Sequence, residues 1–193
     1  RFFLKQVLEG DFYQQYQVAE QYRVIKDIAI SGNGEPTSLR CFEQVIELIG
    51  KVATEMNVLP KSKFVLITNG SLIHQIHVQE GLKCLNKYKG QVWYKLDSAT
   101  ALGRKAINDS KQSTEKTLNN LCIAADLCET RLQTCMLDFL AEKDAELERQ
   151  AYIELLKNNK IKIKDIMLYT IARPSLQPEA EQLNKIDGQV MTE

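Results

Sequence analysis

Five short apolar segments alternate with amphipathic helical patterns along this chain of 193 residues. The segments are rich in Ile, Val, Leu and aromatic residues, are bounded by turn residues, and read as buried strands at 27–31, 64–68, 91–96, 131–137 and 165–171. Apolar residues recur at helical spacing in 39–57, 78–88, 113–128 and 143–158, and we expect a leading helix over 3–20. The regular alternation predicts βαβ units around a parallel sheet, an α/β fold.

A barrel is favoured over an open sheet by the pattern within the strands. Polar residues occupy alternate positions at Lys95 and Asp97, and again at Arg131, Gln133 and Cys135. A sheet covered by helices on both faces is expected to be apolar on both faces. A barrel with a water-filled lumen, in contrast, tolerates polar side chains that point inward. No linker or repeat divides the chain, so we predict a single domain over residues 1–193.

Composition excludes several classes of protein. Lys and Arg total 25 and so do Asp and Glu, so bulk charge gives no signal for nucleic acid. No apolar stretch approaches the roughly 20 residues of a membrane-spanning helix. The five cysteines are odd in number and irregularly spaced. They suit reduced thiols better than a disulfide framework, so we expect a cytoplasmic protein.

Polar clusters follow the predicted strands. They are SGNGEPTS (31–38), TNGS (68–71), KLDSAT (95–100), QTC (133–135) and ARPS (172–175). Each of them alone is compatible with an ordinary turn or helix cap. Parallel α/β folds bind ligands at the carboxyl edge of the sheet, so five clusters together predict a ligand site there.

The first cluster suits a cation better than a phosphate. Gly32 and Gly34 match only the opening of a phosphate-binding loop, and no Lys follows. Glu35 stands where a phosphate would need positive charge, and its carboxylate attracts a cation instead. The glycines permit close approach of the backbone, and Pro36 suits a first helical turn. The turn therefore predicts an ammonium ligand, with a plain capping role for Glu35 as the alternative.

SGNGEPTS resembles the Gly-Gly-Glu-Pro motif that follows the second strand in radical S-adenosylmethionine enzymes. ITNGS (67–71), VWYKLDSAT (92–100), LQTCML (132–137) and MLYTIARPSLQPEA (167–180) resemble the later strand ends of an uncharacterised branch of that family. The resemblance implies a partial TIM-type (β/α)6 barrel. It also implies a [4Fe–4S] cluster that reductively cleaves S-adenosylmethionine to a 5′-deoxyadenosyl radical, which abstracts hydrogen from a substrate. A flavodoxin or ferredoxin would supply the electron.

The Cys-x-x-x-Cys-x-x-Cys loop that holds the cluster in this family does not occur in the sequence, and neither does the first strand. An open barrel lacking a strand would expose an unpaired edge. We therefore expect the chain to be the larger, C-terminal part of such an enzyme, truncated at both ends and inactive by itself, with cluster ligands upstream.

The resemblance assigns cofactor-binding positions residue by residue. Gly32, Asn33, Gly34 and Glu35 match the motif that holds the methionyl ammonium, and Lys95 and Ser98 match positions that contact the carboxylate or ribose. Asn69 positions the cofactor or shapes its turn, and Gln133 is an inward candidate for adenosine or substrate. Arg173 is a candidate carboxylate ligand or a member of a structural ion pair.

Two other functions stay open. Lys95 on a barrel strand is a candidate Schiff-base nucleophile for an aldolase-type lyase, or the partner of Asp97 in an ion pair. A degenerate barrel that binds a nucleoside without catalysis is the second. His74 and His77 lack a clear third ligand, and Cys122 and Cys128 are out of phase on their helix, so no metal site is predicted within the chain.

Overall fold

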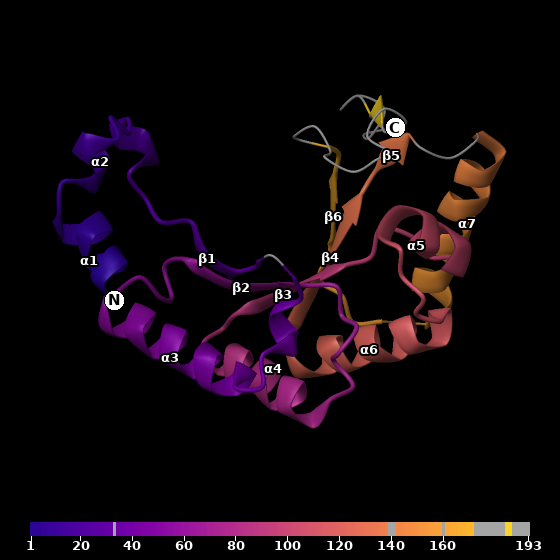
Figure 1. Ribbon diagram of the computed structural model, residues 1–193, viewed down its shortest axis with the longest axis horizontal. Helices are drawn as coiled ribbons and strands as arrows, with labels where there is room; N and C mark the ends of the chain where they lie inside the picture. Colours follow the sequence, from indigo (N-terminus) through magenta and orange to yellow (C-terminus); the bar gives the residue numbers. More distant parts are fainter. Residues whose placement is uncertain (33, 139–141, 160, 172–183, 187–193) are drawn as a thin grey trace.

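The computed structural model describes residues 1–32, 34–138, 142–159, 161–171 and 184–186. Its centre is a five-stranded parallel sheet in the order β1-β2-β3-β4-β6 (Figure 1). The strands are Asp27–Ile30 (β1), Lys63–Thr68 (β2), Gln91–Lys95 (β3), Glu129–Cys135 (β4) and Ile166–Tyr169 (β6). All five predicted strands are confirmed, and their sequential order follows from the alternation of strands with crossover helices.

The crossover helices cover one face of the sheet. They are Phe42–Glu55 (α3), Ile76–Lys87 (α4), Thr114–Leu127 (α6) and Glu142–Asn159 (α7), and Figure 1 shows α3, α4 and α6 along the same side of the strands. The core lies between these two layers. It includes Phe42 and Ile46 of α3, Leu82 and Leu85 of α4, and Leu121 of α6, each at most 1% exposed. Burial of such apolar stripes, rather than intrinsic propensity, holds these helices in place.

The opposite face of the sheet carries polar residues along β3 and β4, as the alternation predicted. On β3, Val92 and Tyr94 are buried against the helices, while Trp93 and Lys95 face the other side and are half-buried. The neighbouring β4 repeats this pattern, and its Arg131 and Gln133 lie in register with Trp93 and Lys95. These residues form the concave face of a partial TIM-type barrel. Among the described residues β1 pairs only with β2, so the barrel is open at that edge.

The predicted leading helix over 3–20 is wrong. The segment forms two short helices, Phe2–Glu9 (α1) and Phe12–Gln15 (α2), followed by a 3-10 turn, Glu20–Tyr22 (η1). Gly10 ends α1 in an extended conformation, and a left-handed Gln17 (φ +50°) follows α2. Glycine is a common helix terminator, and this signal outweighed the apolar pattern around it.

Three elements were missed by the sequence patterns. A short helix, Ala101–Asn108 (α5), begins directly after β3's polar cluster, with Thr100 as its N-cap. Leu137–Asp138 (β5) and Asn184–Lys185 (β7) form a two-stranded antiparallel sheet. Elements this short carry too few residues for a periodic signal.

Two predicted site residues, Asn33 and Arg173, lie outside the described residues. The single domain over 1–193 stays a prediction.

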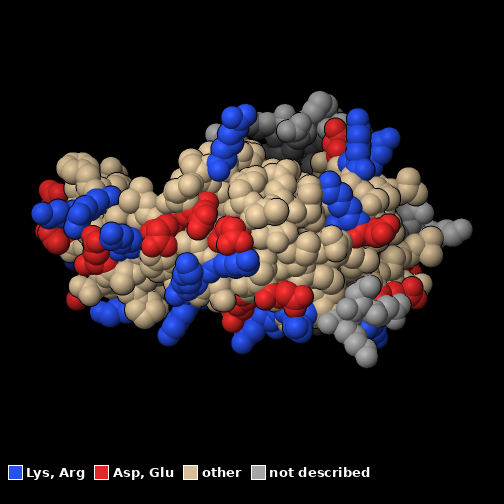
Figure 2. All heavy atoms as spheres, turned by 90° about the horizontal axis from the view of Figure 1, so that it is seen from below, with Lys and Arg blue, Asp and Glu red and all other residues tan. Residues whose placement is uncertain are grey.

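Within the part of the chain that the structure describes, no helix has the length and apolar character needed to span a bilayer. The solvent-facing side of the helical layer carries interspersed basic and acidic residues (Figure 2).

Candidate functional site

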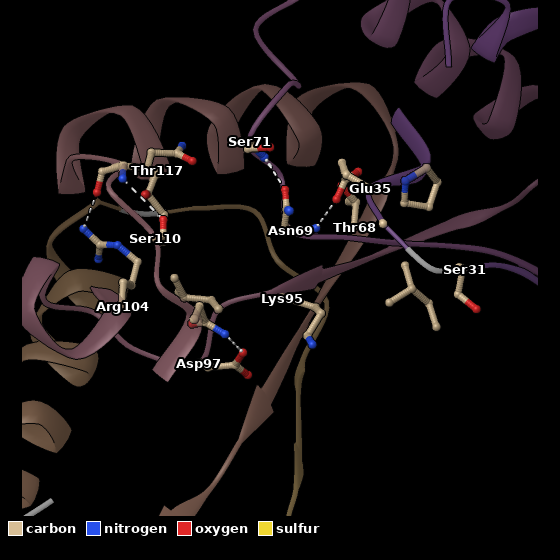
Figure 3. Close-up of a pocket in the computed structure, with 17 residues that line it drawn as sticks. Ser31, Glu35, Thr68, Asn69, Ser71, Lys95, Asp97, Arg104, Ser110 and Thr117 are labelled. Carbon is tan, nitrogen blue, oxygen red and sulfur yellow. Dashed lines mark hydrogen bonds between the residues drawn. The ribbon is translucent and has the colours of Figure 1, made fainter. Parts of the chain in front are cut away.

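A cavity of about 640 Å³ opens at the carboxyl ends of β1, β2 and β3 (Figure 3). Its walls come from the polar clusters that follow these strands and from the α5–α6 region. The residues that line it include Gly34, Glu35, Asn69, Lys95, Asp97 and Arg104. Polar segments far apart in sequence meet here because parallel strands all end at one edge of the sheet. The volume is in the range of small-molecule sites.

Glu35 connects the first strand's turn to the second strand. Its Oε1 accepts hydrogen bonds from the Thr37 backbone N–H at 3.2 Å, the Thr37 hydroxyl at 2.6 Å and the Thr68 hydroxyl at 2.5 Å. Its Oε2 accepts one, from the Asn69 backbone N–H at 2.8 Å. Glu35 thereby caps the 3-10 turn Pro36–Ser38 (η2). Oε2 accepts one hydrogen bond where Oε1 accepts three, so Oε2 keeps acceptor capacity for a ligand in the cavity that Glu35 lines.

The glycines beside Glu35 leave the rim of the cavity open. Gly34 has φ +120°, which an L side chain rarely adopts, and a Cβ there would meet no atom within 4 Å. Gly32 is equally free of neighbours and has no such backbone constraint. The need for glycine at position 34 therefore comes from the backbone conformation, while the space in front of it is available to a ligand.

Asn69 shapes the turn after β2 and also lines the cavity. Its Oδ1 accepts the Ser71 backbone N–H at 2.9 Å, while its own backbone N–H is held by Glu35. The following Gly70 is left-handed (φ +71°), and a Cβ there would lie 2.2 Å from the ring of Tyr94. Burial raises the pKa of the Tyr94 hydroxyl, which donates to the Thr117 carbonyl at 3.2 Å.

Lys95 projects into the cavity from the end of β3. It makes no hydrogen bond or ion pair with any described residue. The predicted alternative of a Lys95–Asp97 ion pair is not formed. The two oxygens of Asp97 instead accept the Cys135 backbone N–H and the Asn108 side-chain amide, both at 2.8 Å. Lys95 is thus a half-buried cation available to a ligand.

Two other predicted residues do not line the cavity. Ser98 is fully buried, and its hydroxyl donates to the Thr100 carbonyl at 3.1 Å. Gln133 lies beside Lys95 on the concave face of the sheet, outside the cavity wall. The structure therefore brings Gly32, Gly34, Glu35, Asn69 and Lys95 together and leaves Ser98 and Gln133 apart from them.

Arg104 of α5 is a cavity residue that the sequence patterns missed. It is 5% exposed, and its Nη1 donates to the carbonyls of Ser98 and Ala99. Its Nη2 donates to the Gln112 carbonyl and the Thr114 hydroxyl. Burial lowers the pKa of the guanidinium, while the nearby Glu148 carboxylate opposes that effect. The only signal in the sequence was one basic residue in a short helix, which is ordinarily solvent-exposed.

Glu148 of α7 holds the same loop from its other side. It accepts hydrogen bonds from the backbone N–H groups of Ala99 and Thr100 and from the Thr100 hydroxyl. Burial acts to raise the pKa of Glu148, but these hydrogen bonds together hold it below the usual value. Arg104 binds the carbonyls of the loop and Glu148 binds its N–H groups, so residues 98–100 are fixed between two opposite charges.

The described residues do not accommodate an iron–sulfur cluster. No group of three or more His, Cys, Asp or Glu side chains within them is placed to hold a metal ion. Cys41 is exposed, whereas Cys84 and Cys128 are buried. Burial raises the pKa of each of these two thiols to about 12, so neither is a thiolate near neutrality. Burial and the nearby Asp97 also raise the pKa of Cys135.

Comparison with known proteins supports the fold. The sequence matches no protein-family model and no curated protein. Among solved structures, the chain is similar to TYW1, a radical S-adenosylmethionine enzyme solved with a lysine–pyruvate adduct bound. The TM-score is 0.59 at 19% sequence identity, over 93% of this chain and 54% of that chain. This chain therefore spans about half the length of the TYW1 chain. The likeness establishes an α/β fold of the partial TIM-barrel type.

Proposed function

We propose that this chain forms the S-adenosylmethionine-binding barrel of a radical S-adenosylmethionine enzyme. The observation that carries the proposal is the placement of Glu35, a fixed carboxylate with a free acceptor position at the rim of the cavity. The fold shared with TYW1 supports it. When bound and reductively cleaved, S-adenosylmethionine supplies hydrogen-abstracting chemistry. The described residues provide no cluster ligands, so the part proposed for them is to hold the cofactor.

The chain's own contribution is binding and orientation. Glu35 Oε2 is the acceptor for the methionyl ammonium, and the glycines on either side of position 33 leave room for the amino acid to approach the backbone. Lys95 supplies a cation for an acidic group of the cofactor or the substrate. Four hydrogen bonds hold the Glu35 carboxylate before any ligand arrives, so little conformational entropy is lost on binding.

Titration calorimetry with two related ligands tests the proposal. S-adenosylmethionine carries the ammonium group, whereas 5′-methylthioadenosine keeps the nucleoside and lacks the amino acid. We expect the wild-type protein to prefer S-adenosylmethionine, and Glu35→Gln to lose most of that preference while binding 5′-methylthioadenosine as before. Glu43→Gln, an exposed acid on α3, is the matched control. Equal affinity of the wild-type protein for the two ligands would contradict the role of Glu35.

A second candidate function is Schiff-base chemistry at Lys95. The side chain is half-buried in the cavity and makes no ion pair with a described residue, and the similar TYW1 structure contains a lysine–pyruvate adduct. The unprotonated amine would add to a ketone, and loss of water would give the imine. Borohydride reduction in the presence of pyruvate, followed by peptide mass analysis, should then trap an adduct at Lys95. Absence of an adduct at Lys95 would remove this candidate.

A further inference from the structure

Two hydrogen-bond donors at the α5 side of the cavity have no partner among the described residues. They are Nε of Arg104 and Nε2 of Gln112, both buried atoms of residues that line the cavity. We call this pair the α5 subsite. The other two nitrogens of the Arg104 guanidinium reach four acceptors, so the unpaired Nε–H is the one donor left over from an otherwise satisfied group.

An unpaired buried donor is costly, because desolvation of the group is not offset by a hydrogen bond. Here two such donors belong to residues of the same cavity lining, and one of them is part of a cation. Both are donors, so they are complementary to acceptor atoms. Charge-assisted bonds from Arg to an oxyanion are the strongest way to satisfy such a pair.

The surrounding charges are compatible with an anion. The ammonium of Lys95 lines the same cavity without an ion pair to a described residue. Asp97 is an acid that lines the same cavity, and its two oxygens accept hydrogen bonds from the Cys135 backbone N–H and the Asn108 side-chain amide. Glu148, the other acid close to Arg104, is engaged by the backbone of residues 99–100.

The α5 subsite is separate from the Glu35 rim. Figure 3 shows Arg104 and Glu35 at opposite sides of the cavity, with Ser110 and Asn69 between them. The ammonium and carboxylate of an amino acid are attached to the same carbon atom. A methionyl group held by its ammonium at Glu35 keeps its own carboxylate on the Glu35 side of the cavity, and the α5 subsite is left for a second group.

We propose that the α5 subsite binds an oxyanion, the carboxylate or phosphate group of a substrate that occupies the cavity together with the cofactor. The identification of this ligand as the substrate rests on the proposed function, whereas the oxyanion site itself does not. The substrate class is thus an acidic small molecule, oriented by Arg104 and Gln112 with its opposite end toward Lys95.

The proposal is tested with simple ions and no cofactor. The chain has seven arginines, and the Nε–H of each gives its own signal in a ¹H–¹⁵N NMR spectrum of arginine-labelled protein. The Arg104 signal is the one that disappears in Arg104→Lys. We expect malonate or inorganic phosphate to shift that signal saturably while the signal of the exposed Arg149 stays in place. A response to malonate alone selects a carboxylate substrate, and a response to phosphate alone selects a phosphorylated one.

Gln112→Leu keeps the proposal testable if Arg104→Lys does not fold, because the Gln112 backbone carbonyl that holds Arg104 is retained. Calorimetry should show about tenfold weaker binding of the ion, the factor expected for one lost hydrogen bond to a charged group. Gln150→Leu on α7, an exposed residue whose side-chain amide donates to Glu146, should bind the ion as the wild-type protein does.

Two results would overturn the proposal: no shift of the Arg104 signal with either ion, or equal affinity of the Gln112 and Gln150 variants for the ion. Since the ions are titrated without S-adenosylmethionine, failure here leaves the Glu35 site intact, and failure of cofactor binding leaves the oxyanion site intact.

Discussion

The hydroxyl of Thr68 donates to Glu35 across 33 residues of sequence, at 2.5 Å. The same Thr68 oxygen accepts the Gly70 backbone N–H at 3.0 Å, so one side chain fixes both the β1 turn and the β2 turn. We predict that Thr68→Val lowers the free energy of unfolding by about 2 kcal/mol, since a hydrogen bond to a charged group is lost and a buried N–H is left unpaired. Urea titration measures this change.

Thr54→Val is the matched control for that substitution. The Thr54 hydroxyl donates to the Gly50 carbonyl within α3 and makes no hydrogen bond to another element among the described residues. Its replacement should change the free energy of unfolding by less than about 1 kcal/mol. Equal losses of stability in Thr68→Val and Thr54→Val would show that the Glu35–Thr68 hydrogen bond adds no more stability than a hydroxyl bond within one helix.

The backbone of Gly70 packs closely against the ring of Tyr94. Alanine at position 70 would adopt an unfavourable positive φ and would press its Cβ against a fully buried ring. We predict that Gly70→Ala lowers the free energy of unfolding by about 2–4 kcal/mol. Gly32→Ala meets no atom within 4 Å and should be neutral within about 0.5 kcal/mol. Thermal unfolding measures the stability of both variants. A Gly70→Ala protein as stable as the Gly32→Ala protein would contradict the close packing of Gly70 against Tyr94.

The five strands and four crossover helices were predictable because each carries a periodic apolar pattern long enough to be read. The position of the ligand edge followed from the same pattern, since every parallel strand ends on one side. The roles of single residues did not follow. Ser98 and Lys95 are three positions apart, yet one is enclosed by the Thr100 loop and the other lies in the cavity. Arg104 was missed because only tertiary contacts with residues 98–99 make a surface-type residue buried.

Glu148 gives the fold a dependence on pH. Its pKa is lowered in the folded protein, so its contribution to stability is fully present above the unfolded value of about 4.3 and is lost as the pH falls through the lower, folded value. We predict that the wild-type protein loses stability on acidification through this range and that Glu148→Gln lacks that part of the loss. Chemical unfolding at a series of pH values measures it.

Glu146→Gln on the same helix is the control for Glu148. Glu146 is exposed and pairs with Arg149 at 2.7 Å, so its effect should be small and should vanish in high salt. The effect of Glu148→Gln should persist in high salt, because its partners are backbone N–H groups within the fold. If both effects disappear with salt, Glu148 acts as a surface charge and does not anchor the loop at residues 98–100.

Thiol labelling distinguishes the exposed cysteine from the buried ones. Cys84 donates to Glu47 Oε2 at 3.0 Å between α3 and α4, and burial followed by this carboxylate raises its pKa to about 12. Cys128, which directly precedes β4, is buried, and burial likewise raises its pKa to about 12. We predict that a maleimide near neutral pH modifies Cys41 rapidly, whereas Cys84 and Cys128 react only as the protein unfolds. Peptide mass analysis over time gives the order of modification. Early modification of Cys84 in folded protein would show that the α3–α4 interface opens locally.

Glu47→Gln is a control for the labelling experiment, because it removes the carboxylate but keeps the packing. It should leave the order of labelling unchanged, since burial is the larger cause of the raised pKa of Cys84.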